Sequence, residues 1–337
     1  MPGDHICLTR RRLLASLPAL PLLAGGCNFS PSETLRLGFN PWPGYELFTL
    51  AEQLGYYRQL GLDVQLVEFT SLGDSRRAFE RQQIDVAAGT AVELLTASST
   101  LKQTVQAFFL TNVSAGADYL IAQPHFTSAA SLKGRRVAVE PGSLNLLVLH
   151  LALQAAAGTG GPLTLQDLQL VPLSQTSMPG AFQRQEVEAV VVYPPVADEL
   201  LRLVPEQARV LFDSSMTPDF ILDLLYATRS TLEQRTGELV LLVQGFEMAR
   251  QYTHDHPDDA YARMAARTGR KRDDFERDMR GVRLVPLPEQ AALLQRGGRA
   301  ERILYESLQA LRDAGMNLTL AEAGLASSNI VTRAYSQ

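Results

Sequence analysis

Polar and aromatic side chains gather in one short stretch whose chemistry suits the binding of a small molecule. Residues 40–46 read Asn-Pro-Trp-Pro-Gly-Tyr-Glu, and Trp42 is the only tryptophan of the chain. Its ring offers a flat apolar face on which a ligand can stack. The alternative is that the ring closes the rim of a hydrophobic core, and these residues alone leave both roles open.

The elements on either side explain why this stretch is a candidate site. The alternating run 34–39 predicts a strand, and apolar residues at helical spacing from Leu47 to Tyr57 predict a helix. Ligands of open α/β sheets bind outside the carboxyl ends of the strands. The free N–H groups of a helix N-terminus can hold polar or anionic groups there. Polar turns also follow later predicted strands, at 71–74, Thr90, 143–145 and Tyr193.

The order of the predicted elements indicates an α/β fold. The predicted strands of the first series are 34–39, 63–69, 84–90 and 105–110. A second series begins with a strand at Val137, after the small polar stretch 111–118 has interrupted the first. Strands that alternate with helices predict parallel, doubly wound sheets. An apolar run at 220–228 then crosses back. The helices predicted after it, which should cover the first lobe, are 237–252, 257–267, 273–280 and 299–314.

We therefore predict two lobes, each a doubly wound sheet, with the second lobe inserted into the first. The first lobe should comprise 34–117 and 219–337, and the second lobe 118–218. The crossings between them are expected near 114–118 and 214–219. A ligand that touches both lobes favours their closed arrangement, so a cleft of this kind suits a binding protein that closes about a hinge.

The first 27 residues have the features of an export signal. Arg10, Arg11 and Arg12 precede a short apolar segment, and small residues follow it up to Cys27. A charged start, a short apolar region and a small-residue cleavage zone make a secretory signal, and this apolar region is too short to span a bilayer. The arginines resemble a twin-arginine signal with Leu13 where that motif often has Phe. Both the twin-arginine and the general secretory route stay open.

The residues before Cys27 also resemble a bacterial lipobox, with Ala24 where a leucine is usual. We expect a lipid on Cys27 to be the only membrane anchor, followed by a tether at 28–33, because a lone exposed thiol is unusual in an exported protein. The alternative is an ordinary signal peptide with an incidental cysteine. Either way the expected location is the periplasm or the cell envelope.

Composition excludes several classes of function. The 337 residues carry a formal charge of −5, and the leader holds three arginines and one aspartate, which leaves −7 for the rest. A mildly acidic protein is a poor partner for nucleic acid. Both cysteines, Cys7 and Cys27, fall in the leader, so the rest has no disulfide, thiolate metal site or cysteine nucleophile. We expect no cofactor, no metal and a monomer.

Six motifs occur in an order and spacing that resemble one family. They are the stretches 37–45, 54–64, 84–86, 114–118, 132–139 and 189–195. Together they resemble the nitrate/sulfonate/taurine-type periplasmic substrate-binding proteins of ABC importers, a group that includes NMT1/THI5-like binders of thiamine pyrimidines. The resemblance covers roughly Leu35 to Tyr226. It implies a periplasmic-binding-protein-like fold of type II, capture of a small polar nutrient, and delivery to an ABC permease.

The resemblance also implies a site at the strand ends of both lobes. With the polar turns above, the candidate ligand-binding residues are Asn40, Trp42, Tyr45, Asp74, Gly89, Thr90, Ser114, Asp118, Ser143, Asn145 and Tyr193. Some of them have structural alternatives. Gly89 and Thr90 can form a helix cap, Ser114 and Asp118 can form a hinge turn, and Tyr193 can lie at the edge of the core.

Two other functions stay open. Pyrimidine synthases of the yeast type share the fold but need a cofactor-binding lysine and a cysteine-rich segment. The lysines here are Lys102, Lys133 and Lys271, none of them at a predicted strand–helix turn. His254 and His256 suggest a metal pair without an obvious third ligand, and a solvated helix end explains them. The second alternative is a sensor module that presents its bound solute to a partner protein.

The candidate residues favour a small ligand that is sulfonate-like or contains nitrogen. The turns hold no lysine, and Asp74 and Asp118 bring negative charge. A bare dianion is therefore unfavourable unless Arg76 or Arg77 reaches the cleft. We expect a small sulfonate-like or nitrogenous nutrient, such as an aminosulfonate zwitterion or a flat nitrogen heterocycle stacked on Trp42.

Overall fold

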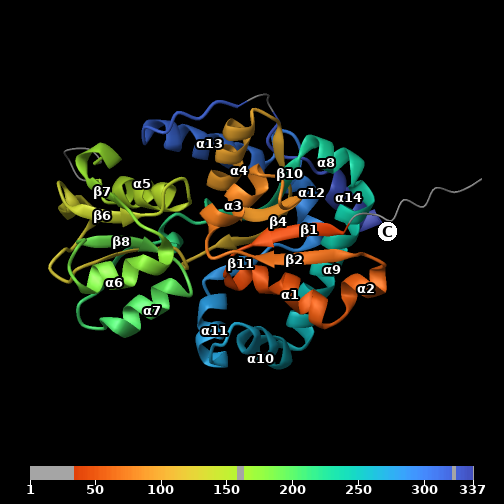
Figure 1. Cartoon of the computed structure of the whole chain (residues 1–337), viewed down its shortest axis with the longest axis horizontal. Helices are drawn as coiled ribbons and strands as arrows, with labels where there is room; N and C mark the ends of the chain where they lie inside the picture. Colours follow the sequence, from red (N-terminus) through yellow and green to blue (C-terminus); the bar gives the residue numbers. More distant parts are fainter. Residues whose placement is uncertain (1–33, 158–162, 321–323, 337) are drawn as a thin grey trace, which may run out of the picture. The chain divides into compact units, whose positions relative to one another are not determined.

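Two β-sheets organise the part of the chain that the computed structural model describes, which is residues 34–157, 163–320 and 324–336. The predicted leader 1–27, the lipid on Cys27 and the tether 28–33 lie outside these described residues. Figure 1 shows the strands of one sheet apart from those of the other, with helices beside both.

The first sheet has six strands in the order β11-β4-β10-β3-β1-β2. They are β1 (Leu35–Phe39), β2 (Val64–Glu68), β3 (Val86–Thr90), β4 (Val105–Ser114), β10 (Leu222–Thr228) and β11 (Val282–Leu284). Strands β1, β2 and β3 run parallel to one another. Strand β10 lies between β3 and β4 and is antiparallel to both, and β11 is antiparallel to β4. The prediction of a purely parallel sheet is therefore wrong. The chain leaves the sheet at the end of β4 and re-enters it beside that end, at the start of β10. Strand β10 must therefore run antiparallel to β4.

The second sheet has five strands in the order β7-β6-β8-β5-β9. They are β5 (Tyr119–Ala122), β6 (Arg136–Val139), β7 (Gln169–Pro172), β8 (Ala189–Val192) and β9 (Arg209–Asp213). Strands β6, β7 and β8 are parallel, and β5 is antiparallel to both of its neighbours. All five lie between β4 and β10 in the sequence, so the prediction of a second sheet inserted into the chain of the first is confirmed.

Strand β4 extends past its predicted end at Leu110 through Thr111–Ser114, which the prediction assigned to an interruption. The hydroxyl of Thr111 donates to the carbonyl of Asp223 at 3.1 Å, and the N–H of Ser114 donates to the carbonyl of Ile221 at 3.0 Å. The small polar composition was misleading because these groups bond to the neighbouring strand rather than to water.

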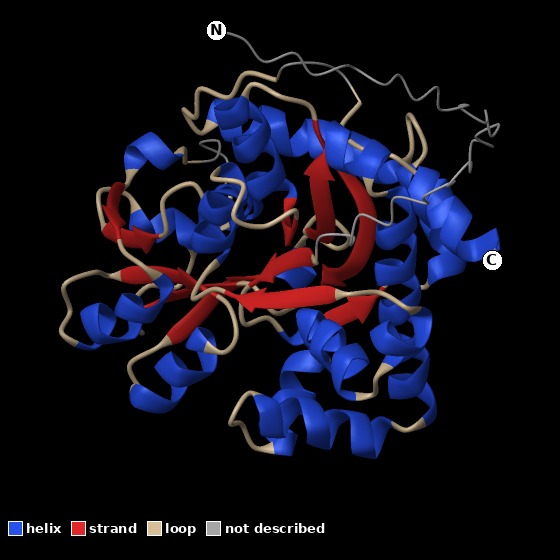
Figure 2. Cartoon of the chain, turned by 45° about the vertical axis from the view of Figure 1, so that its right-hand side comes forward, coloured by secondary structure: helices blue, strands red, loops and turns tan. Residues whose placement is uncertain are grey.

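Helices cover both sheets (Figure 2). Beside the second sheet lie α5 (Asn145–Ala155), α6 (Met178–Gln183) and α7 (Val196–Leu203). The first sheet carries α1 (Glu46–Gln53), α2 (Tyr56–Leu60), α3 (Leu72–Glu80), α4 (Ala91–Leu101), α8 (Arg229–Gln234), α9 (Thr236–Asp255), α10 (Pro257–Arg267), α11 (Arg272–Met279), α12 (Leu287–Leu294), α13 (Arg299–Asp313) and α14 (Asn329–Ser336). The C-terminal helices cover the first sheet as expected, and α13 also packs on α5. The helix predicted through Tyr57 is interrupted at Gly55, whose φ of 76° is left-handed.

Aromatic packing holds the first turn of the chain in place. Phe48 of α1 packs on Phe246 of α9 with 4.8 Å between ring centroids, and Phe246 packs on Phe109 of β4 at 5.1 Å. Phe39, at the end of β1, lies 6.4 Å from Phe48. The two ends of the stretch 40–46 are thus anchored in one buried cluster, so the side chains of that stretch have fixed positions.

Candidate ligand-binding site

Strand ends of both sheets enclose one small cavity. Its lining residues are Asn40, Trp42, Tyr45, Leu72, Asp118, Leu144, Tyr193 and Asp223. Its volume of about 10 Å³ is close to the minimum that holds one water molecule. A ligand larger than water can therefore enter only when the elements around the cavity move apart.

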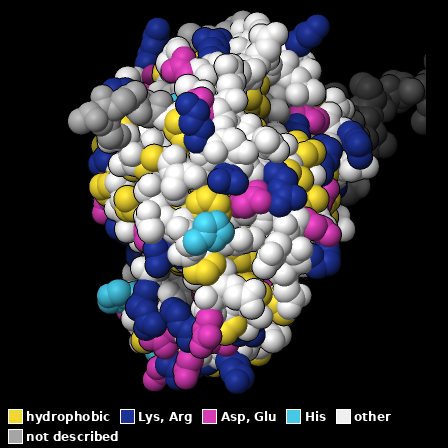
Figure 3. Space-filling model, turned by 90° about the vertical axis from the view of Figure 1, so that its left-hand side faces the viewer, with side chains coloured by type: hydrophobic (Ala, Val, Ile, Leu, Met, Phe, Trp, Pro, Cys, Tyr) yellow, Lys and Arg dark blue, Asp and Glu magenta, His cyan; other side chains and the backbone are white. Residues whose placement is uncertain are grey.

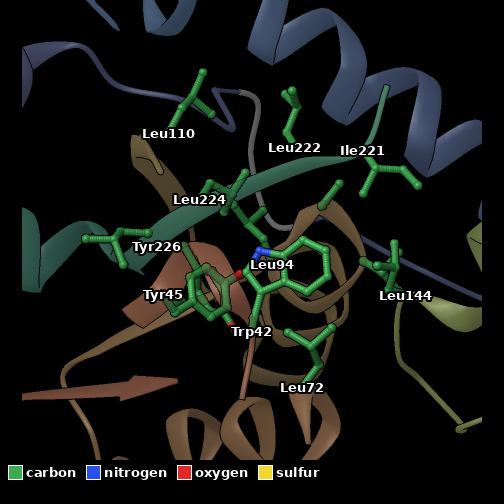
Figure 4. Close-up of a cluster of buried hydrophobic side chains, with 14 of the residues drawn as sticks. Trp42, Tyr45, Leu72, Leu94, Leu110, Leu144, Ile221, Leu222, Leu224 and Tyr226 are labelled. Atoms are coloured by element: carbon green, nitrogen blue, oxygen red, sulfur yellow. The ribbon is translucent and has the colours of Figure 1, made fainter. Parts of the chain in front are cut away.

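The turn after β1 contributes two aromatic rings. A short 3₁₀ helix at Pro43–Tyr45 joins β1 to α1. The indole N–H of Trp42 donates to Oδ1 of Asn112 at 3.1 Å, and its ring meets the edge of Tyr193 with 6.2 Å between centroids. Gly44 allows this approach, because a Cβ there would lie 2.3 Å from Nδ2 of Asn112. Figure 4 shows Trp42 beside Tyr45, with Leu72 and Leu144 nearby.

Trp42 therefore fits both roles that its sequence context left open. It is 5% exposed and belongs to the buried apolar cluster of the molecule, and it also lines the cavity. The core holds the ring in place while one part of it remains available to a ligand.

Unpartnered polar atoms concentrate at the cavity. Oδ1 of Asn40, Oδ2 of Asp118 and Oδ2 of Asp223 are buried without a hydrogen-bond partner among the described residues. A buried polar group without a partner costs about 1–3 kcal/mol. Native proteins leave few such groups, so three around one cavity indicate a place that a bound molecule completes.

The carboxyl groups of the cavity are strongly perturbed. Burial raises the pKa of Asp118 to about 7, the negative charge of Glu93 adds to the rise, and the Ser114 hydroxyl opposes it. Burial also raises the pKa of Asp223, and the hydroxyl of Tyr45, which donates to Oδ1 of Asp223 at 2.6 Å, works the other way. None of the lining residues is a lysine or an arginine.

Gly89 and Thr90 lie outside the cavity lining and have the structural role that was their alternative. Thr90 begins α4 in a capping box, in which Oε2 of Glu93 accepts from the Thr90 N–H at 2.9 Å and from its hydroxyl at 2.6 Å. A Cβ on Gly89 would meet Glu93 at 3.3 Å. The other oxygen of Glu93 accepts from the N–H of Leu144 at 3.0 Å, which ties α4 to the turn before α5.

The two crossings between the sheets meet at Ser214. Its Oγ lies 2.7 Å from Oγ of Ser114 and accepts from the N–H groups of Gly116 and Ala117 at 2.7 and 3.1 Å. Ser114 thus lies in a hinge contact outside the cavity lining, whereas Asp118, four residues later, lines the cavity.

The remaining candidates also lie outside the cavity lining. Asp74 is 40% exposed and pairs with Arg77 at 2.7 Å. Asn145 is buried, and its Oδ1 accepts from the N–H of Glu140 and from Nε2 of Gln175, both at 2.8 Å. Ser143 is buried with its hydroxyl unpartnered. It flanks Leu144, which does line the cavity.

Sequence reasoning missed three lining residues, Leu72, Leu144 and Asp223. The two leucines give no signal, because nothing local distinguishes them from core leucines. Asp223 does give one, because it is the only charged residue in the otherwise apolar run 220–228. A carboxylate inside a buried strand needs a partner, and that need was the available clue.

A larger groove lies on the other side of Trp42, with a volume of about 250 Å³. Its lining residues are Pro41, Trp42, Pro43, Glu46, Glu68, Pro195, Arg267, Thr268, Arg270 and Phe275. Its arginines are already neutralised: Arg267 pairs with Glu46 and Glu68, and Arg270 pairs with Asp198 of α7 and with Asp278. The groove offers space beside the cavity but no unpaired cation among these residues.

Neither a metal cluster nor a membrane-spanning helix occurs in the described part of the chain. Among them, no group of three or more His, Cys, Asp or Glu side chains is arranged to hold a metal ion. His254 instead lies 2.9 Å from Oδ1 of the neighbouring Asp255. In the same part of the chain, no helix has the length and apolar character that a membrane crossing requires.

Comparison with known proteins gives one family. The family model described as NMT1/THI5 like matches residues 42–260. A Brucella abortus protein named "Putative binding protein BAB2_1146" is 24% identical over 257 residues, which cover 75% of this chain and 77% of that protein.

Solved structures share the fold at lower identity. The periplasmic aliphatic sulphonate binding protein SsuA from Escherichia coli is 20% identical with a TM-score of 0.61, over 86% of this chain and 94% of that one. The ligand binding component of an ABC-type import system from Staphylococcus aureus is 14% identical with a TM-score of 0.70, over 89% and 98%. The desulfurization enzyme DSZB is 18% identical with a TM-score of 0.59, over 90% and 99%. These structures establish a periplasmic-binding-protein fold, which binding proteins and an enzyme share.

Proposed function

Because the chain belongs to the NMT1/THI5-like family, we propose that it is an extracytoplasmic solute-binding protein. It captures a small polar nutrient between its two lobes and delivers it to an ABC importer. The solved binding proteins of the same fold, from Escherichia coli and Staphylococcus aureus, support this role. Export through the predicted leader, with a lipid on Cys27 as the anchor, belongs to the same proposal.

The cavity carries the proposal. Trp42 and Tyr45 come from the first lobe, Leu144 and Tyr193 from the second, and Asp118 from a crossing between them. A solute held by groups from both lobes stabilises the closed arrangement, which is the state that a permease would recognise. The lobes proposed for this movement are 34–117 with 219–337, and 118–218.

The lining favours binding over catalysis. It holds no histidine, cysteine, lysine or serine, so among its residues there is neither a Ser–His nor a Cys–His pair of nucleophile and base. This point matters because the enzyme DSZB has the same fold. The surface over the second sheet, seen in Figure 3, mixes acidic and basic side chains, without the basic field that nucleic acid requires.

A thermal-shift screen of residues 28–337 tests the proposal. The panel contains taurine, alkanesulfonates, nitrate, bicarbonate, thiamine, its pyrimidine precursors and polyamines. A solute at 100 times its dissociation constant adds about 2.7 kcal/mol, which raises the melting temperature by several degrees. We expect Trp42→Ala to reduce the shift, and Tyr335→Ala, which alters a 65% exposed tyrosine on α14, to leave it unchanged.

Two results would count against this proposal. If no solute shifts the melting temperature, the importer role loses its support. If the protein co-purifies with a sensor kinase rather than a permease, the bound solute is presented to a signalling partner instead.

A further inference from the structure

Three carboxyl groups lie at the cavity or directly behind it, and none of them is more than 3% exposed. Asp118 and Asp223 line the cavity, and Glu93 bonds the backbone of Leu144, a third lining residue. The charge of Glu93 also raises the pKa values of both aspartates. Ionisation of Asp118 and Asp223 is therefore unfavourable until a positive charge enters the cavity.

The nearby arginines do not neutralise this charge. Arg76 pairs with Glu80, and Arg77 pairs with Asp74 at 2.7 Å. Neither residue lines the cavity. No arginine therefore lines the cavity, although Nη2 of Arg76 approaches the turn after β6, where it lies 3.3 Å from the position of a Cβ on Gly142.

One N–H at the start of α5, a helix end that could hold an anion, is already bonded within the protein. The turn before α5 presents the N–H of Leu144, and Oε1 of Glu93 accepts from it at 3.0 Å. Glu93 is held there by its two bonds to Thr90. A sulfonate or carboxylate ligand would have to displace this carboxylate, which belongs to the protein itself.

All three unpartnered atoms at the cavity are oxygens able to accept a hydrogen bond. They are Oδ1 of Asn40, Oδ2 of Asp118 and Oδ2 of Asp223. An ammonium group has three donors and no acceptor, so it complements this set. A sulfonate offers acceptors only, so it cannot donate to any of these oxygens, and the two carboxyl groups could bind it only in their protonated form. The aromatic rings of Trp42 and Tyr193 add faces to which a cation is attracted.

We propose that the solute held in this cavity carries a positively charged nitrogen, which Asp118, Asp223 and Asn40 bind directly and which Glu93 stabilises through its charge. The inference rests on the proposed solute-binding function and narrows its substrate class to amines and related nitrogen cations, zwitterions included. It also assigns to Glu93 the exclusion of purely anionic solutes.

Binding of such a cation should depend on pH. The titratable groups that interact electrostatically with the two aspartates are Glu93 on α4, Tyr45 before α1, Tyr193 after β8 and Tyr119 on β5. Only ionised aspartates attract the cation, so binding should release protons. We expect the dissociation constant of an amine to fall as the pH rises from 6 to 8.

The test compares amines and sulfonates that have the same carbon skeleton. Isothermal titration at pH 8 uses butylamine with butanesulfonate, 1,4-diaminobutane with butane-1,4-disulfonate, and benzylamine with phenylmethanesulfonate. We expect at least one amine to bind and its sulfonate partner to bind at least tenfold more weakly. Asp223→Asn, which keeps an acceptor for the Tyr45 hydroxyl, should weaken the amine at least tenfold. Glu233→Gln removes the same charge from an exposed position of α8 and should change nothing.

Each other outcome overturns the inference. A sulfonate that binds as tightly as its amine partner contradicts it, and so does an amine whose affinity Asp223→Asn leaves unchanged. If no amine binds while a solute of the nutrient panel without a cationic nitrogen binds, such as an alkanesulfonate or nitrate, the cationic class is wrong and the solute-binding function stands. If none of the solutes binds, the result contradicts the solute-binding function itself.

Discussion

At the scale of single residues, burial and charge conflict most clearly at Asp118. This carboxyl is 1% exposed, and burial raises its pKa to about 7 from an ordinary value of 3.8. In the unfolded chain the group ionises near pH 4, whereas in the folded protein it keeps its proton until about pH 7. The unfolded state therefore binds fewer protons in between, and stability falls as the pH rises from about 4 to 7.

Asp118→Asn should remove this loss of stability with rising pH. We expect the variant and the wild type to be similarly stable near pH 4, and the variant to be more stable above pH 7, by up to roughly 4 kcal/mol. Urea unfolding between pH 4 and pH 8 measures the difference, with Glu233→Gln as the exposed control. Equal pH profiles for Asp118→Asn and the wild type would show that water reaches Asp118 in the ligand-free protein.

At the scale of elements, the two crossings between the sheets depend on one hydroxyl. Ser214 follows β9 and is fully buried, and it accepts from the N–H groups of Gly116 and Ala117 on the other crossing. Because Asp118 comes directly after these residues, the same contacts determine where its carboxyl lies. The position of Asp118 therefore depends, through the backbone of residues 116–118, on the contact between the two crossings.

Ser214→Ala should destabilise the protein, because it leaves buried N–H groups without an acceptor. The expected cost is about 1–3 kcal/mol. The matched control is Ser215→Ala at the next position, whose hydroxyl forms an exposed contact with Asp213. It should change stability by no more than about 0.5 kcal/mol. Equal free energies of unfolding for the two variants would contradict the hinge role of Ser214.

At the scale of the whole molecule, a few contacts close the lobes on each other. Oγ of Ser71 donates to Glu140 at 2.5 Å, and Glu93 accepts from Leu144. The guanidinium of Arg270, in the first lobe, pairs with Asp198 in the second. Beside them, Trp42 packs on Tyr193 and α13 packs on α5, so polar and apolar contacts together hold the proposed lobes around the cavity of about 10 Å³.

Asp198→Asn should favour the open arrangement, because it removes the ion pair between the lobes. The ion pair of Arg270 with Asp278 remains. We expect a larger radius of gyration by small-angle X-ray scattering without added solute, and little change in the free energy of unfolding. The control is Glu186→Gln, which breaks the exposed pair with Arg184 inside the second lobe. Identical scattering from Asp198→Asn and the wild type would exclude a role of this pair in closure.

Much of this protein is determined by the local sequence. The alternation at 34–39, the Pro-Trp-Pro-Gly-Tyr turn and the helical spacing after it were enough to predict β1, the turn and α1. They placed Asn40, Trp42 and Tyr45 at a strand end, where the cavity lies. These features depend on residues within a few positions of one another, so periodicity and turn chemistry reveal them.

Only the tertiary structure decided which other groups meet this turn. The partner of the Tyr45 hydroxyl is Asp223, 178 residues away, and it arrives because β10 returns between β3 and β4. Glu93 likewise meets Leu144 across 51 residues. Pairing between distant strands and helices leaves no local pattern, so the sequence alone did not show that Asp223 lines the cavity while Asp74 and Thr90 do not. The physical reason is that burial, which raises the pKa values of Asp118 and Asp223, is a property of the assembled lobes and not of any short stretch.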